Sequence, residues 1–188
     1  MPFPSLALDP DNRARLVSEL DLDTDSPIVA LCPGAAFGPS KRWPIEYFGQ
    51  VANELTMRGY SVWIVGSESE APMGQAIAEA APAVRDLCGK TALVDAVDLL
   101  SLAAVTTTND SGLMHIAAAV GSHVVAVYGS TPPWFAPPLT QSRSVHYSEL
   151  SCSPCFKREC PLGHHDCMRL ITPAMVAAEV FDAVEPSG

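Results

Sequence analysis

The sequence predicts an α/β protein of the Rossmann-like class, in which helices cover both faces of one parallel sheet. From residue 27 onward, short apolar runs that resemble buried strands alternate with stretches of helical periodicity. This alternation is typical of parallel sheets, whose connections are right-handed. The chain has 188 residues, of which 48% are hydrophobic and 17% charged, which suits one globular domain.

The first strand is predicted at Ile28–Leu31, after a polar segment that we interpret as an interdomain linker with one short helix at 13–20. Residues 1–26 form this linker, and residues 27–188 form the domain. Pro44 opens the first helix of the domain, since proline is tolerated at the first helical position. One apolar stripe follows at helical spacing, and Gly59 ends the helix. The stripe consists of Ile45, Phe48, Val51, Ala52 and Leu55.

The remaining elements follow in the same alternation. Gly89, Lys90 and Thr91 are expected to cap the third helix of the domain. The helix at 113–120 is apolar all round except for His115, so it is expected to be buried. Further strands are predicted at 60–65, 84–87, 104–108, 123–128 and 144–147, and further helices at 72–81, 89–102 and 173–184.

The acidic composition limits the partners that this chain can have. Its formal net charge is −10, so nucleic acid and anionic lipid are repelled at long range. No apolar run approaches the roughly 18 residues that a membrane span needs, and the start does not resemble a signal peptide. These features predict a cytoplasmic protein, in which six cysteines are kept reduced.

Four loops are expected at the carboxyl ends of the strands, where open α/β sheets bind ligands. They span residues 33–43, 66–70, 109–112 and 129–132. The first contains two glycines and the basic pair Lys41 and Arg42, directly before a helix. A diphosphate could bind there, and the alternative is a solvated pair of charges.

The loop at 109–112 begins the buried helix, whose free N–H groups could hold a phosphate. Asp110 or Ser111 could equally be an ordinary helix cap, and His115 a core residue. In the loop at 66–70, Ser67, Glu68 and Glu70 offer hydroxyl and carboxylate groups for a ribose. The alternative is that these acidic residues only stabilise the amino terminus of the following helix through its dipole, with no ligand.

Two motifs together resemble the heptosyltransferases of glycosyltransferase family 9, in particular the heptosyltransferase II group. They are Pro33-Gly-Ala-Ala-Phe-Gly-Pro-Ser-Lys-Arg-Trp-Pro44 and Asn109-Asp-Ser-Gly-Leu-Met-His115. The resemblance implies the donor-binding half of a GT-B enzyme, which uses ADP-heptose and a lipopolysaccharide core acceptor. It also implies a missing N-terminal domain that carries the catalytic base and contacts the acceptor, so no catalytic residue is assigned within this chain.

The resemblance also implies roles for individual residues. Lys41 would contact the donor phosphates, and Glu68 or Glu70 the ribose. Asp110, Ser111, Gly112 and His115 would form the turn beneath the diphosphate and heptose. Lys90 and Thr91 would border the adenine. The family needs no catalytic metal, and its substrates place such enzymes at the inner face of the inner membrane as peripheral proteins.

The loop at 151–169 is rich in cysteine and also contains His164 and His165. Its spacing could form a structural zinc or iron–sulfur site, and the alternative is reduced, unligated thiols. The four thiols belong to Cys152, Cys155, Cys160 and Cys167.

Two other functions remain open at this point. One is a different GT-B enzyme, such as an epimerase that acts on a uridine nucleotide. The other is a module that binds a nucleotide or a partner without catalysis.

Overall fold

The structure is a computed structural model that describes residues 2–185. It confirms the α/β class: six parallel strands form one sheet in the order β3-β2-β1-β4-β5-β6. The strands are β1 (Ile28–Cys32), β2 (Ser61–Ile64), β3 (Arg85–Asp86), β4 (Val105–Asn109), β5 (His123–Tyr128) and β6 (Arg143–Tyr147). All six predicted strands are therefore present, with bounds within about two residues of those expected.

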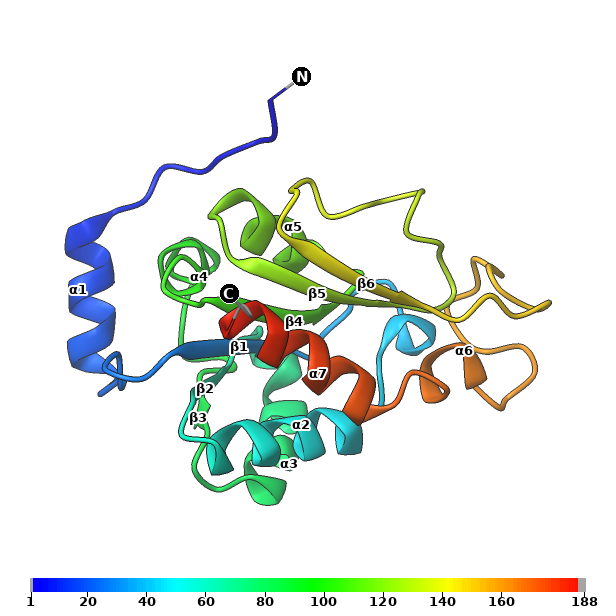
Figure 1. The fold of residues 1–188 in the computed structure, drawn as a ribbon, viewed down its shortest axis with the longest axis horizontal. Helices are drawn as coiled ribbons and strands as arrows, with labels where there is room; N and C mark the ends of the chain where they lie inside the picture. The colour runs from blue at the N-terminus through cyan, green and yellow to red at the C-terminus, as the bar shows by residue number, and fades with distance from the viewer. Residues whose placement is uncertain (1, 186–188) are drawn as a thin grey trace.

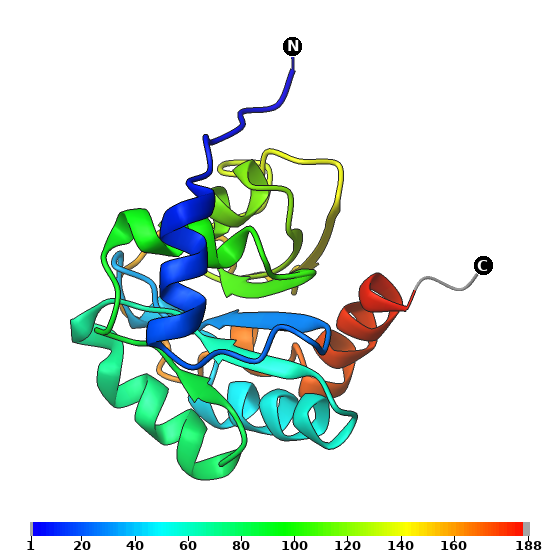
Figure 2. The same ribbon diagram turned by 90° about the vertical axis from the view of Figure 1, so that its left-hand side faces the viewer.

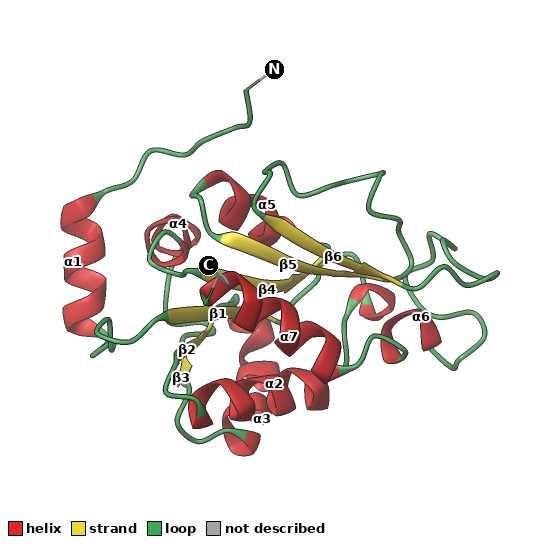
Figure 3. Cartoon of the chain, in the orientation of Figure 1, coloured by secondary structure: helices red, strands yellow, loops and turns green. Residues whose placement is uncertain are grey.

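Helices cover both faces of this sheet (Figure 1). One face carries α2 (Ile45–Met57), α3 (Ala71–Ala80) and α7 (Pro173–Val184), and the other carries α1 (Pro10–Glu19), α4 (Leu93–Leu100) and α5 (Gly112–Ala119). The short helices η1 (Pro39–Lys41), η2 (Glu68–Glu70) and α6 (Asp166–Arg169) lie within the connections. Figure 3 shows that long loops dominate the region on either side of β6.

Alternate side chains of the central strands supply two separate cores. On β1, Val29 and Leu31 point toward α2 and α7, whereas Ala30 and Cys32 point toward α4 and α5. All of these are fully buried, as is expected of a central parallel strand that is covered on both sides. The sheet is therefore the middle layer of a three-layer sandwich.

Three details of the predicted helices are wrong. Pro44 precedes α2 as its N-cap and is not its first helical residue. The cap of α4 is Ala92, whose backbone N–H donates to the Asp95 carboxylate at 2.8 Å, and not the Gly89–Thr91 segment. In addition, α5 is not buried all round, because Leu113 and Ile116 are only partly buried and His115 is exposed.

The segment that was interpreted as a linker packs on the domain. Helix α1 lies beside α4, as Figure 2 shows, and Leu16 and Leu22 are buried in the core on that side. The Asn12 side-chain amide donates to Asp98 at 2.7 Å and to Asp95 at 3.1 Å. No helix within residues 2–185 is long and apolar enough to cross a membrane.

The strand order fixes where a ligand can bind. The chain runs outward from β1 to β3 on one side and from β4 to β6 on the other, so the direction of winding reverses between β1 and β4. In folds with this order, a crevice opens at the carboxyl ends of the two central strands. The loops after β1 and β4 flank it here.

Candidate functional site

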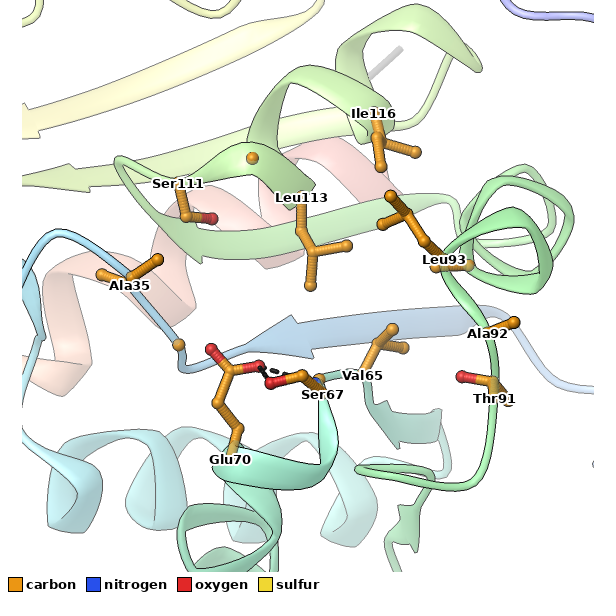
Figure 4. A pocket seen from close by; sticks show the side chains of 15 residues that line it. Ala35, Val65, Ser67, Glu70, Thr91, Ala92, Leu93, Ser111, Leu113 and Ile116 are labelled. Carbon is orange, nitrogen blue, oxygen red and sulfur yellow. Dashed lines mark hydrogen bonds between the residues drawn. The ribbon is translucent and has the colours of Figure 1, made fainter.

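A cavity of about 310 Å³ opens at this crevice (Figure 4). Its walls come from the loop after β1, the loop after β2, the amino end of α4 and the amino end of α5. Of the ten residues expected at the site, five line the cavity: Ser67, Glu70, Thr91, Ser111 and Gly112. The other five lie outside its lining. Two of these, Lys41 and Asp110, belong to the loops after β1 and β4 that flank the cavity.

Glu70 is held in the cavity by its own turn. Its carboxylate accepts hydrogen bonds from the Ser67 backbone N–H at 2.6 Å and from the Ser67 hydroxyl at 2.9 Å (Figure 4). A Cβ atom at Gly34 would lie 1.5 Å from a Glu70 carboxylate oxygen, so only glycine lets the two loops approach this closely. Of the two glutamates proposed for the ribose, Glu70 lines the cavity, whereas Glu68 lies against Gly89.

Lys41 and Asp110 form an ion pair that joins the loops after β1 and β4. The Lys41 Nζ atom lies 2.6 Å from Asp110 Oδ2, and the two side chains are only 13% and 6% exposed. The Thr131 hydroxyl donates to the same carboxylate oxygen at 2.5 Å. Asp110 is thus bound to side chains and does not cap α5, because Ser111 occupies the N-cap position without a capping side-chain hydrogen bond.

This pair leaves Lys41 able to bind an anion. An ammonium group has three N–H donors, and Asp110 occupies one of them. Asp110 also offsets the charge of Lys41, so an anion at this point would need further donors. The first turn of α5 has backbone N–H groups without intrahelical partners and begins at Gly112, on the cavity wall.

Asn109 connects the same loops and was not expected to matter for the site. It is fully buried at the end of β4. Its side-chain amide donates to the Pro33 carbonyl at 2.7 Å, and its side-chain oxygen accepts from the Trp43 backbone N–H at 2.9 Å. Asn109 therefore holds both ends of the loop that contains Lys41.

The outer part of the cavity is apolar. Leu93 of α4, which is 69% exposed, faces Leu113 and Ile116 of α5 across it (Figure 4), and Ala96 also lines the cavity. Such a wall suits a flat, weakly polar ring. Thr91 stands at its edge.

Besides Glu68, two expected site residues lie away from the cavity and from the Lys41–Asp110 pair. Lys90 donates a hydrogen bond to its own loop, at the Asp86 carbonyl at 2.7 Å. His115 is exposed and lines a separate surface hollow with Leu6 and Leu139. The expected roles of both residues at the adenine and the diphosphate remain predictions.

The arrangement supports binding of one elongated ligand with three chemical parts. The α5 amino end and Lys41 would hold an anionic group, Glu70 and Ser67 would hold hydroxyl groups, and the apolar wall would hold a ring. A nucleoside diphosphate has all three of these parts.

The family model for glycosyltransferase family 9 (heptosyltransferase) matches residues 1–165 of the chain. Lipooligosaccharide heptosyltransferase 2 of Haemophilus influenzae is 38% identical over 92% of the chain and 53% of its own length. Lipopolysaccharide heptosyltransferase 2 of Escherichia coli K12 is 34% identical over 95% of the chain and 53% of its own length.

A solved structure agrees with these matches. E. coli ADP-heptose lipopolysaccharide heptosyltransferase II superposes with a TM-score of 0.84 at 33% identity, over 96% of this chain and 53% of that one. The chain therefore spans about half the length of the relatives that it matches.

Proposed function

Because the chain belongs to glycosyltransferase family 9, the heptosyltransferases, we propose that its cavity binds the ADP-heptose donor of a transfer to the lipopolysaccharide core. The observation that supports this most is the convergence at the sheet's switch point. Glu70 and the amino end of α5 line the cavity there, and the Lys41–Asp110 ion pair joins the loops after β1 and β4 that flank it.

In this proposal the adenine lies against Leu93 and Ala96, and the ribose hydroxyls donate to Glu70. The diphosphate lies between Lys41 and the first turn of α5. The heptose then extends past the diphosphate, out of the crevice. The apolar wall and the Glu70 carboxylate, which line the cavity, and the Lys41 cation, which lies in a loop that flanks it, support this order.

The same groups would assist the transfer itself. As the bond between heptose and diphosphate breaks, negative charge accumulates on the phosphate oxygens. Lys41 and the α5 amides are fixed donors, and fixed donors that face a developing charge stabilise a transition state without reorganising. Thr131 and Asp110 would keep Lys41 in place for this purpose.

The acceptor and the cellular site are also proposals. The lipopolysaccharide core acceptor would be bound by residues outside the cavity described above. Relatives in Salmonella typhimurium and Escherichia coli are named lipopolysaccharide heptosyltransferase 2, and a lipid-linked acceptor of that kind supports a peripheral position at the inner face of the inner membrane.

Titration calorimetry of the chain with ADP, AMP and UDP tests the donor proposal. ADP should bind about ten- to a hundredfold more tightly than AMP, because the β-phosphate adds one charge-assisted hydrogen bond of about 1.5–3 kcal/mol. UDP should bind more weakly than ADP, because the smaller uracil covers less of the apolar wall. Equal affinity for ADP and AMP would favour a module that does not recognise a diphosphate, and a preference for UDP would favour a uridine-nucleotide enzyme.

A further inference from the structure

The loop between β6 and α7 gathers four cysteine thiols around one small cavity. The cavity measures about 20 Å³, enough for about one water molecule or one ion. Residues far from these thiols in the sequence, Ser40 and Ser130, also line it. The thiols, named here the thiol cluster, belong to Cys152, Cys155, Cys160 and Cys167.

The backbone around Cys160 favours a thiolate. Four backbone N–H groups donate hydrogen bonds to the Cys160 sulfur. These groups belong to residues 162–165. A turn that directs several amides at one sulfur is suited to a sulfur that carries negative charge.

The four sulfurs are also close enough to affect one another. All four thiols line the same cavity of about 20 Å³. Four thiolates cannot share a small cavity without a compensating positive charge. No lysine or arginine side chain lines the cavity.

We propose that the thiol cluster binds one thiophilic metal ion, zinc or ferrous iron, and that this ion braces the segment that carries Lys41. Four thiolates complete a tetrahedral set, which is the closed form that structural metal sites take. The two neighbouring histidines already have other partners. The His164 Nδ1 atom accepts from the Asp166 backbone N–H at 2.9 Å, and the His165 Nε2 atom lies 3.2 Å from the Ser40 carbonyl oxygen.

Metal binding would require the thiols to reorient. Within residues 2–185, no three His, Cys, Asp or Glu side chains are already arranged to hold an ion. Rotation about χ1 moves a cysteine sulfur between staggered positions without moving the backbone. Because all four thiols already line the same cavity, the proposal asks for side-chain rotation and no change of fold.

The thiol cluster loop is hydrogen-bonded to the Lys41 segment. The Ser40 backbone N–H donates to the Arg158 carbonyl at 3.1 Å, and the Ser40 hydroxyl donates to the Lys157 carbonyl. A Cβ atom at Gly38 would lie 2.5 Å from the Arg158 carbonyl oxygen, so the two segments are in close contact. An ion that orders the loop therefore orders the residues next to Lys41.

The same loop also supports the partners of Lys41. The Phe156 backbone N–H donates to the Ser130 carbonyl at 2.8 Å, and the Ser153 hydroxyl donates to the Gly129 carbonyl at 2.6 Å. These bonds hold the loop after β5, which contains Thr131. The effect on nucleotide binding rests on the proposed function, whereas metal binding itself does not.

Elemental analysis of the purified chain, after removal of any affinity tag, tests metal binding. We expect about one zinc or iron ion per chain, in line with one set of four ligands. Protein that is stripped with a chelator and refilled with Co²⁺ should show the visible absorption of tetrahedral cobalt bound to thiolates. Protein that contains no metal when purified, and that shows no such spectrum with Co²⁺, would overturn the proposal in favour of unligated thiols.

Two variants test the link to nucleotide binding. Cys155→Ser should lose the metal, melt at a lower temperature and bind ADP several-fold more weakly, whereas Cys32→Ala, which removes a buried thiol outside the cluster, should keep the metal. If Cys155→Ser fails to fold, chelated wild-type protein provides the same comparison. Metal-bound protein whose ADP affinity does not change on chelation would contradict the bracing role. Metal-bound protein that never binds ADP would instead contradict the proposed function.

Discussion

Replacement of Lys41 by alanine is expected to weaken ADP binding by about 1.5–3 kcal/mol, the range for a hydrogen bond to a charged group. The same change should lower the stability of the fold. Asp110 is 6% exposed in its side chain and would lose its cationic partner. Breaking a buried ion pair typically costs about 3–5 kcal/mol, and the Thr131 hydroxyl would offset part of this. Calorimetry with ADP and a thermal melt of the same preparation would measure both effects.

A second variant separates binding from stability. In the double variant Lys41→Met and Asp110→Asn, no charge is left unpaired in the interior, so stability should recover while ADP affinity stays low. Arg58→Ala is a matched control, because Arg58 is a cation at the other end of α2. If Lys41→Ala folds and binds ADP as tightly as the wild type does, Lys41 does not belong to the site.

Asn109→Ala is expected to weaken both the fold and the site. It removes the partners of the Pro33 carbonyl and the Trp43 backbone N–H, which are buried. Each buried polar group left without a partner costs about 1–3 kcal/mol. The loop after β1 would lose the connection at both of its ends and become more mobile. ADP binding would then have to order the Lys41 segment, and the conformational entropy lost would weaken the affinity. We therefore expect a lower melting temperature and a weaker ADP affinity.

Asn53→Ala provides the comparison for this change. Asn53 is an exposed asparagine on α2 and should leave both the melting temperature and the ADP affinity unaltered. An Asn109→Ala protein with the wild-type melting temperature would show that its hydrogen bonds are replaced by water at little cost. The connecting role of Asn109 would then be contradicted.

The fold could be predicted because its signals are local. The alternation of buried strands with amphipathic helices lies in consecutive residues, and the stripe from Ile45 to Leu55 marks the buried face of α2. The end of a strand can be located in the same way, so the loops around the crevice could be named in advance. Helix caps depend on one or two side chains, and for this reason the caps of α2 and α4 were misassigned.

The connections within the site depend on contacts between distant residues. Lys41 and Asp110 are 69 positions apart, and either residue alone fits a solvent-exposed loop. Thr131 and Asn109 are ordinary residues for a strand or its exit, and only their partners reveal what they do. The choice between Glu68 and Glu70 likewise required the position of Gly34, which allows the Glu70 carboxylate to lie against the loop after β1.

A crystal structure of the chain with ADP would test the central claim most directly. The account predicts the diphosphate between Lys41 and the first turn of α5, the ribose hydroxyls on Glu70 and the adenine against Leu93. Lys41 should keep one hydrogen bond to Asp110 and give another to a phosphate oxygen. ADP bound elsewhere on the protein, or bound in the cavity with its phosphates away from Lys41 and α5, would contradict the account.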